Sequence, residues 1–305
     1  MATNRFIKDR GLAARMTVVM FLLGLLFTVL VVAISAVLWD AGGPGWGLLV
    51  GVAGIAVAFY QWWTSDKVAM RAMRAREVTI EEAPELHGMI DRLCALADMP
   101  KPRVGVADMD VPNAFATGRS PERSVVCVTT GILDTLTAEE LEGVLAHELS
   151  HVAHRDVLVM TVASSAGIAA GLLVQFVSRM RPRGKNAGGA VVMILLSFVV
   201  AAIVYAISFL LLRLLSRYRE LCADRSGAYL TMKPAALASA LQKISTVGAA
   251  IPNADLRKNA AVSALCIAPA FNSVMLSGIF ATHPPLEKRL EQLAAIQTEL
   301  GRTVG

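Results

Sequence analysis

Charged side chains are scarce in this sequence. Asp, Glu, Lys and Arg account for 17% of the 305 residues and hydrophobic residues for 55%, and the mean hydropathy is +0.56. Soluble globular domains carry about 25% charged residues, so this composition excludes a protein that lies wholly in water. We therefore expect part of the chain to lie in a lipid bilayer.

Cysteine is also scarce, and its placement matches no metal or disulfide pattern. The four cysteines are widely spaced without a Cys-x-x-Cys pair, at Cys94, Cys127, Cys222 and Cys266. We interpret them as small buried hydrophobic residues in a reducing compartment. The net charge of +5 lacks interleaved aromatic residues, so it fits anionic lipid better than nucleic acid, and we predict no nucleic-acid partner.

Uncharged stretches, by contrast, are long. Met16 to Trp39 contains no charged residue, and three further apolar runs cover residues 46–63, 157–178 and 190–212. A membrane-spanning helix needs about 20 such residues. The four tryptophans lie at the ends of the first two runs, as is typical of a membrane surface: Trp39, Trp46, Trp62 and Trp63. A signal peptide is the competing interpretation, but its apolar part would be only about 7–15 residues, so we predict an uncleaved anchor.

Basic residues set the expected orientation. The first connection, residues 40–45, has no Lys or Arg, whereas basic residues follow the second run at Lys67, Arg71, Arg74 and Arg76. The N-terminus and the polar middle of the chain are therefore predicted to be cytoplasmic. The connection between the third and fourth runs is also basic, so these runs either cross fully against this rule or dip into the membrane; both alternatives remain open.

The polar stretches divide the chain into four predicted parts. Residues 1–63 form a membrane anchor with two helices, and residues 157–212 form a hairpin that spans or re-enters the membrane. Residues 64–156 and 213–305 are two parts of one cytoplasmic domain. The expected fold class is an α-helical membrane protein whose cytoplasmic domain is mainly α (α+β) and carries a small β-sheet.

Local patterns place the elements of the cytoplasmic domain. Helical spacing of apolar residues predicts a helix over 81–99, on whose polar side we expect His87 to be solvated. Residues 103–110 and 124–131 are typical of strands, with NAFATG, residues 113–118, between them, so we expect a sheet of two or three strands. Thr137 and Glu140 form a capping box that begins the next helix, which leads directly into the third apolar run.

That helix carries a metal-binding motif. His147, Glu148 and His151 form HELSH, an HExxH pattern. Spacing of i and i+4 places both imidazoles on one helical face, where they can bind a single Zn²⁺, and Glu148 projects beside them to take a proton from metal-bound water. The alternative, an exposed helix with incidental histidines, remains open at this point.

A catalytic zinc needs a third protein ligand and an open fourth position. The metzincin pattern is excluded because His154 and Val157 stand where that class has glycine and histidine. The remaining candidates are carboxylates in SRYRELCAD, residues 216–224. Glu220 and Asp224 are one helical turn apart, so one could bind the metal while the other orients a ligand histidine.

These motifs together resemble a known family. HELSH, then SRYRELCAD after an apolar hairpin, with NAFATG upstream and THPPLEKRL near the end, is similar to the HtpX-type membrane zinc endopeptidases, relatives of the CAAX prenyl proteases. The resemblance covers nearly the whole chain. It implies a zincin-like protease domain with one Zn²⁺ per subunit, Glu220 as the third ligand and Asp224 as its supporting partner.

Two further predictions depend on that resemblance. Asn113, Ala114, Phe115 and Ala116 match the family's edge strand, along which an extended substrate would add as an extra strand; the alternative is an ordinary strand and turn. His283 matches a late histidine that could donate a hydrogen bond to an oxyanion; the alternative is a residue at a helix N-terminus. His154 has no matching role, and we interpret it as an interfacial or supporting residue.

The resemblance implies a membrane-protein quality-control enzyme. Its substrates would be misfolded or damaged membrane proteins or unfolded polypeptides, cut at the cytoplasmic face of the cell membrane by a multi-pass protein. A CAAX-type prenyl protease is one alternative. Another is a non-catalytic membrane scaffold with structural zinc, although structural sites are usually closed by four protein ligands. The sequence leaves the oligomeric state open.

Overall fold

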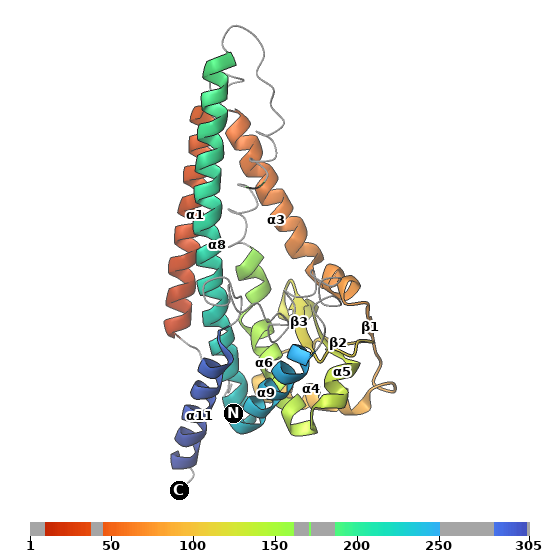
Figure 1. Cartoon of the computed structure of the whole chain (residues 1–305). Helices are drawn as coiled ribbons and strands as arrows, with labels where there is room; N and C mark the ends of the chain where they lie inside the picture. Colours follow the sequence, from red (N-terminus) through yellow and green to blue (C-terminus); the bar gives the residue numbers. More distant parts are fainter. Residues whose placement is uncertain (1–9, 38–44, 162–170, 172–186, 251–283, 304–305) are drawn as a thin grey trace. The chain divides into compact units, whose positions relative to one another are not determined.

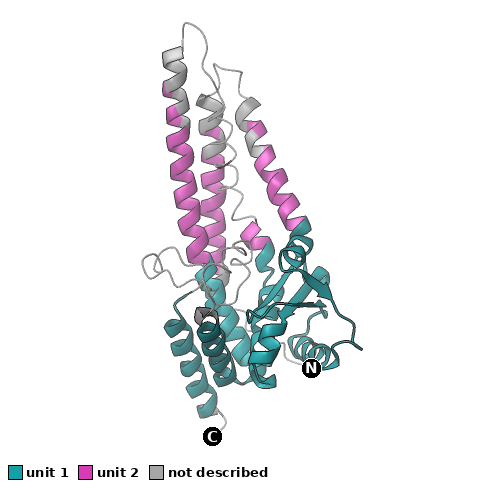
Figure 2. Cartoon of the chain, turned by 45° about the vertical axis from the view of Figure 1, so that its right-hand side comes forward, with its two compact units in different colours: residues 1–12, 64–157, 216–305 teal, residues 13–63, 158–215 magenta. Residues whose placement is uncertain are grey.

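The structure is a computed structural model, and it describes residues 10–37, 45–161, 171, 187–250 and 284–303. These residues are mostly helical, with one small mixed sheet (Figure 1), which confirms that part of the predicted fold class. The chain divides into two compact units (Figure 2). One comprises residues 13–63 and 158–215; the other comprises residues 1–12, 64–157 and 216–305.

Long apolar helices make up the first of these units. They are α1 (Arg10–Val37) and most of α3 (Gly45–Ala72) and α8 (Ala187–Thr231). Phe21, Leu48 and Val192 are among many large apolar side chains that these helices expose. An apolar surface of that extent is unfavourable in water and normal in lipid. The described parts of three of the four predicted apolar runs therefore lie in long helices with exposed apolar side chains.

The described residues contain one stretch, Phe198–Thr231, that is long and apolar enough to cross a membrane, judged by length and composition; Ala14–Val29 is a shorter apolar helix. The third predicted run falls mostly outside the described residues. The multi-pass arrangement therefore stays a prediction. Within this unit, Leu23 and Leu215 form a buried contact between α1 and α8.

The other unit contains the sheet. Its four strands lie in the order β1 (Ala75–Glu77), β2 (Arg103–Ala107), β4 (Ser124–Thr129) and β3 (Ala114–Gly118). β2 and β4 are parallel, whereas β1 and β3 pair antiparallel with their neighbours. β3 is thus an edge strand. β1 was missed by the prediction of two or three strands, because its three residues Ala-Arg-Glu carry no apolar alternation.

Helices cover both faces of the sheet. On one face the core contains residues of α4 (Pro84–Ala97), α6 (Ala138–Ala153), α9 (Pro234–Ala250) and α11 (Leu286–Thr303). On the other face the last turns of α3 bury Ala69 and Met73 against Phe115 and Cys127. Short elements complete the unit: η1 (Pro121–Arg123) and α5 (Thr130–Thr135).

Two local predictions were wrong. His87 is buried rather than solvated, and its Nε2 has a polar partner in the carbonyl oxygen of Val78, 3.0 Å away. The ligand helix does not lead directly into the third run. It ends at Ala153, and Arg155 takes a left-handed conformation with φ of 55° before the chain continues.

The start of α6 is fixed by the predicted capping box and by α9. Thr137 accepts from the Glu140 amide, and Glu140 Oε2 accepts from the Thr137 amide at 2.8 Å. Ser239 and Lys243 of α9 donate to the same carboxylate at 2.6 and 2.7 Å. Burial alone would raise the pKa of Glu140, but the hydrogen bonds from Lys243, Ser239 and Thr137 outweigh it and lower the pKa to about 2.

Replacing Glu140 should therefore destabilise the fold in a pH-dependent way. We expect Glu140→Ala to cost about 1–2 kcal/mol at pH 7, since it removes the capping box and the link to α9. The ionised form has the lower pKa in the folded protein, so its contribution is present above the ordinary value of 4.5 and is lost as the pH falls towards about 2. Denaturant unfolding of wild type and variant across this pH range measures the difference in the free energy of unfolding. A difference that grew as the pH fell would contradict a stabilising role of ionised Glu140.

Candidate metal centre

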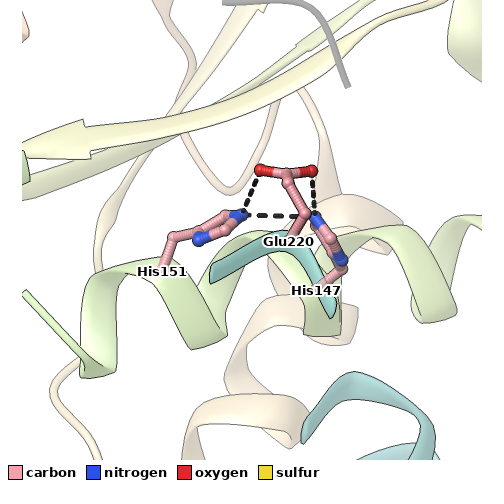
Figure 3. Close-up of side chains that lie close together, drawn as sticks. All are labelled: His147, His151 and Glu220. Atoms are coloured by element: carbon pink, nitrogen blue, oxygen red, sulfur yellow. Dashed lines mark hydrogen bonds and ion pairs between the residues drawn. The ribbon is translucent and has the colours of Figure 1, made fainter. Parts of the chain in front are cut away.

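The two predicted ligand histidines converge on one point. His147 and His151 lie one turn apart on α6, with ring centroids 4.8 Å apart and the planes at 88°. Their Nε2 atoms are separated by 3.2 Å (Figure 3). Helix α6 is buried along most of its length, so both rings are held by packing on a regular helix.

Glu220 of α8 completes the group. Its Oε1 lies 3.5 Å from His151 Nε2 and its Oε2 lies 3.7 Å from His147 Nε2. Each of the three residues offers a ligand atom, and these atoms lie within 4.8 Å of one another (Figure 3). Gly227 lies two turns further along α8 and permits the close approach of α6 and α8. A Cβ atom at this position would lie 3.0 Å from the backbone nitrogen of His147.

This donor set fits zinc. Two imidazole nitrogens and a carboxylate are ordinary zinc ligands, and bonds of 2.0–2.1 Å in tetrahedral geometry place ligand atoms about 3.3 Å apart. The separations of 3.2, 3.5 and 3.7 Å observed here are close to that value. Three protein ligands would leave a fourth position for water, as in catalytic rather than structural sites.

Glu148 lies beside the ligands, on the same helix. Its carboxylate is buried, and its Oε2 accepts a hydrogen bond from the Ala116 amide of β3 at 2.9 Å. Burial raises the pKa of Glu148, and the neighbouring His147 and His151 oppose that change. If the three ligands held a metal with a water, a buried carboxylate in this place would be suited to accept and return a proton.

The four residues predicted to bind substrate lie on or beside β3 and are not equivalent. Ala116 is the one whose backbone contacts Glu148. Asn113 and Ala114 are buried, and the amide of Asn113 donates to the Thr129 hydroxyl at 2.9 Å. The Phe115 side chain packs against α3 on the opposite face of the sheet. The strand's side chains thus serve the core, and its backbone is the part that meets Glu148.

Asp224 lies behind the ligands and pairs with an arginine that sequence reasoning missed. Arg289 of α11 donates to both Asp224 oxygens, at 2.7 Å from Nε and 2.6 Å from a terminal nitrogen. Another of its nitrogens lies 3.8 Å from Glu220. Asp224 Oδ1 is also 2.9 Å from His147 Nδ1. Asp224 therefore lies between Arg289 and a ligand histidine.

The two remaining histidines predicted to matter are His283 and His154. His283 lies outside the described residues, so its role stays a prediction. His154 caps the end of α6, where its Nδ1 lies 2.7 Å from the Ser150 carbonyl oxygen. Asp156 and Arg219, both missed from the sequence, contact the group as well: Asp156 Oδ2 lies 2.6 Å from His151 Nδ1 and 2.8 Å from Arg219. Burial opposes ionisation of Asp156, but Arg219 and His151 hold its pKa below the ordinary value.

The buried pair of Arg289 and Asp224 should be costly to break. We expect Arg289→Met to destabilise the chain by about 3–5 kcal/mol, because it leaves a buried carboxylate without its cation. Adding Asp224→Leu should restore most of that loss, since the Asp224 carboxylate is then no longer left unpaired. Denaturant unfolding of the purified chain measures both effects.

Arg76→Met is the matched control for that experiment. Arg76 pairs with Glu82 at 2.6 Å, but its side chain is 65% exposed, and exposed pairs contribute about 0–1 kcal/mol. If both arginine substitutions lowered the free energy of unfolding equally, the buried pair would contribute no more to stability than the exposed pair.

Comparisons with known proteins agree with this geometry. The model of Peptidase family M48 matches residues 80–297. Protease HtpX homolog 1 of Streptomyces coelicolor is 53% identical over 301 residues, covering 98% of this chain and 97% of the relative. Protease HtpX homolog of Moorella thermoacetica is 44% identical and covers 96% of each chain.

A solved structure supports the fold alone. The crystal structure of S. mikatae Ste24p matches with a TM-score of 0.55 at 16% identity, covering 92% of this chain and 64% of that one. The present chain thus spans less than two thirds of that protein. The family match extends over the HExxH helix, three of the four strands and α8, and the relatives cover nearly the whole chain. They confirm the resemblance found in the sequence. The chain belongs to peptidase family M48 and, within it, groups with the HtpX proteases.

Proposed function

We propose that this protein is a zinc-dependent endopeptidase that cuts misfolded or damaged membrane proteins at the cytoplasmic face of the cell membrane. The observation that carries the proposal is the convergence of His147, His151 and Glu220 within 4.8 Å, with the Glu148 carboxylate beside them. Family membership supplies the peptidase activity. The exposed apolar helices support a membrane location.

The chain's own groups divide the work of peptide hydrolysis. The chemistry that zinc supplies when held by His147, His151 and Glu220 is a water of pKa about 7 and polarisation of the peptide carbonyl. Glu148 accepts the proton of that water and returns it to the leaving amine. The Ala116 amide holds one oxygen of Glu148, which leaves the other oxygen for the water.

Substrate recognition would depend on the backbone. β3 is an edge strand, and an extended polypeptide can add to such an edge through main-chain hydrogen bonds, which require little of its side chains. This tolerance suits an enzyme that acts on unfolded segments of many proteins. His283 is proposed to donate a hydrogen bond to the oxyanion as the carbonyl is attacked.

The role proposed for Glu148 predicts that its replacement abolishes peptide cleavage but not zinc binding. Glu148→Gln should retain one zinc per chain, because the three ligands are intact, and should abolish cleavage of an unfolded protein, because the amide accepts no proton from water. Zinc content and product formation are measured on the same purified sample. Glu139→Gln is the matched control on the same helix, where the side chain is 68% exposed, and it should cleave at the wild-type rate.

Three outcomes separate the alternatives to this function. Cleavage by the Glu148→Gln variant at the wild-type rate would refute the mechanism. Zinc binding without any peptidase activity in the wild type would favour a structural zinc site. Cleavage restricted to a prenylated C-terminal peptide, with unfolded proteins left intact, would favour a CAAX-type prenyl protease.

The proposed orientation predicts which residues can be labelled from outside. In a variant without the four native cysteines, Gly42→Cys lies in the first connection and Asp134→Cys lies at an exposed position of α5. A membrane-impermeant maleimide should label the Gly42 variant in sealed cells and the Asp134 variant only after permeabilisation, since basic residues flank the cytoplasmic side. Labelling of the Asp134 variant in sealed cells would place the sheet outside.

A further inference from the structure

Asp156 occupies its position because of an unusual backbone conformation. Helix α6 ends at Ala153, and Arg155 has a φ of 55°, a left-handed conformation that is uncommon for a residue with a side chain. Such conformations persist where the surrounding structure enforces them, and they cluster at functional sites. Here the turn brings the carboxylate of the next residue to within hydrogen-bond distance of His151.

The Asp156 carboxylate contacts both helices that carry the candidate metal ligands. Asp156 Oδ2 lies 2.6 Å from His151 Nδ1 on α6 and 2.8 Å from Arg219 on α8. Arg219 directly precedes Glu220 in the chain. Asp156 is 3% exposed, so water does not compete for these contacts. One buried carboxylate therefore connects one candidate ligand with the neighbour of another.

We propose that Asp156 is the positioning residue of this metal site. By accepting the Nδ1 proton of His151, it fixes the tautomer whose Nε2 lone pair faces His147 and Glu220. Through Arg219 it also sets the position of the α8 turn that carries Glu220. The inference rests on the proposed zinc site and goes beyond it, because it assigns the orienting function to a residue outside the HExxH and SRYRELCAD motifs.

Asp224, the residue expected to orient a histidine, has a second partner. Both of its oxygens accept hydrogen bonds from Arg289, and one of them lies 2.9 Å from His147 Nδ1. Asp156 lies closer to its histidine, with Oδ2 2.6 Å from His151 Nδ1. The two carboxylates therefore face different histidines: Asp224 is shared between Arg289 and His147, and Asp156 lies next to His151.

Zinc affinity of the full-length protein tests this assignment directly. Asp156→Asn keeps the shape of the side chain but removes the charge that favours the Nδ1 proton, and we expect zinc affinity to fall about 10–100-fold. Affinity is measured by competition with a chelator of known strength. The matched control, Asp134→Asn, changes an exposed aspartate of α5 and should leave the affinity unchanged.

Arg219 provides a second variant within the same contact. Arg219→Gln should weaken zinc binding by a smaller factor than Asp156→Asn. Because both act through one contact, the double variant should lose little more than Asp156→Asn alone. If the loss of zinc affinity in the double variant equalled the product of the two single losses, the two residues would act independently. That result would overturn the proposal that Asp156 acts through Arg219.

A spectroscopic measurement keeps the test independent of folding effects and of enzyme activity. In zinc-loaded protein with ¹⁵N-labelled histidine, the Nδ1 proton of His151 should resonate far downfield, as expected for a short hydrogen bond to a carboxylate. This signal should move upfield in Asp156→Asn and stay in place in Asp224→Asn.

The measurements distinguish a failure of the proposed zinc site from a failure of the positioning role of Asp156. A wild-type chain that binds no zinc would contradict the proposed function as a whole. Zinc-binding wild type combined with a change of less than twofold in Asp156→Asn, or with an unmoved His151 proton, would overturn the positioning role alone. A drop in unfolding temperature with unchanged zinc affinity would also overturn it, since it would show a purely structural role.

Discussion

Balance among buried charges is the constraint on which the site depends. Glu148, Asp156, Glu220 and Asp224 are all buried in one small region, and an ionised carboxylate away from water must be paired. Arg219 and Arg289 supply two positive charges. Asp156 and Asp224 are thus each paired with an arginine, whereas Glu148 and Glu220 lie beside the two histidines.

The HExxH motif could be predicted because its chemistry is local. His147, Glu148 and His151 lie within one turn and a half of a helix whose start is marked by a capping box, so periodicity alone places them together. Glu220 needed the family resemblance, since 68 residues and an apolar hairpin separate it from His151. The structure brings it to the histidines, and the family match covers both segments.

Arg289 and Asp156 could not be predicted, for different physical reasons. In the sequence Arg289 belongs to a helix of alternating charged and apolar residues, where an arginine is normally solvated; tertiary packing alone brings it to Asp224. Asp156 is five residues after His151, a spacing that does not meet on a regular helix. It reaches the ring because α6 ends at Ala153 and Arg155 takes a left-handed conformation.

Gly227 determines how close together the two ligand helices, α6 and α8, can lie. The α8 backbone passes so near to α6 at this residue that a single added carbon would lie 3.0 Å from the His147 nitrogen and 3.3 Å from its Cα atom. The separation of the two ligand helices is thus set by the absence of a side chain. A methyl group here would require the two backbones to move apart by a few tenths of an ångström, although it would replace none of the candidate ligands.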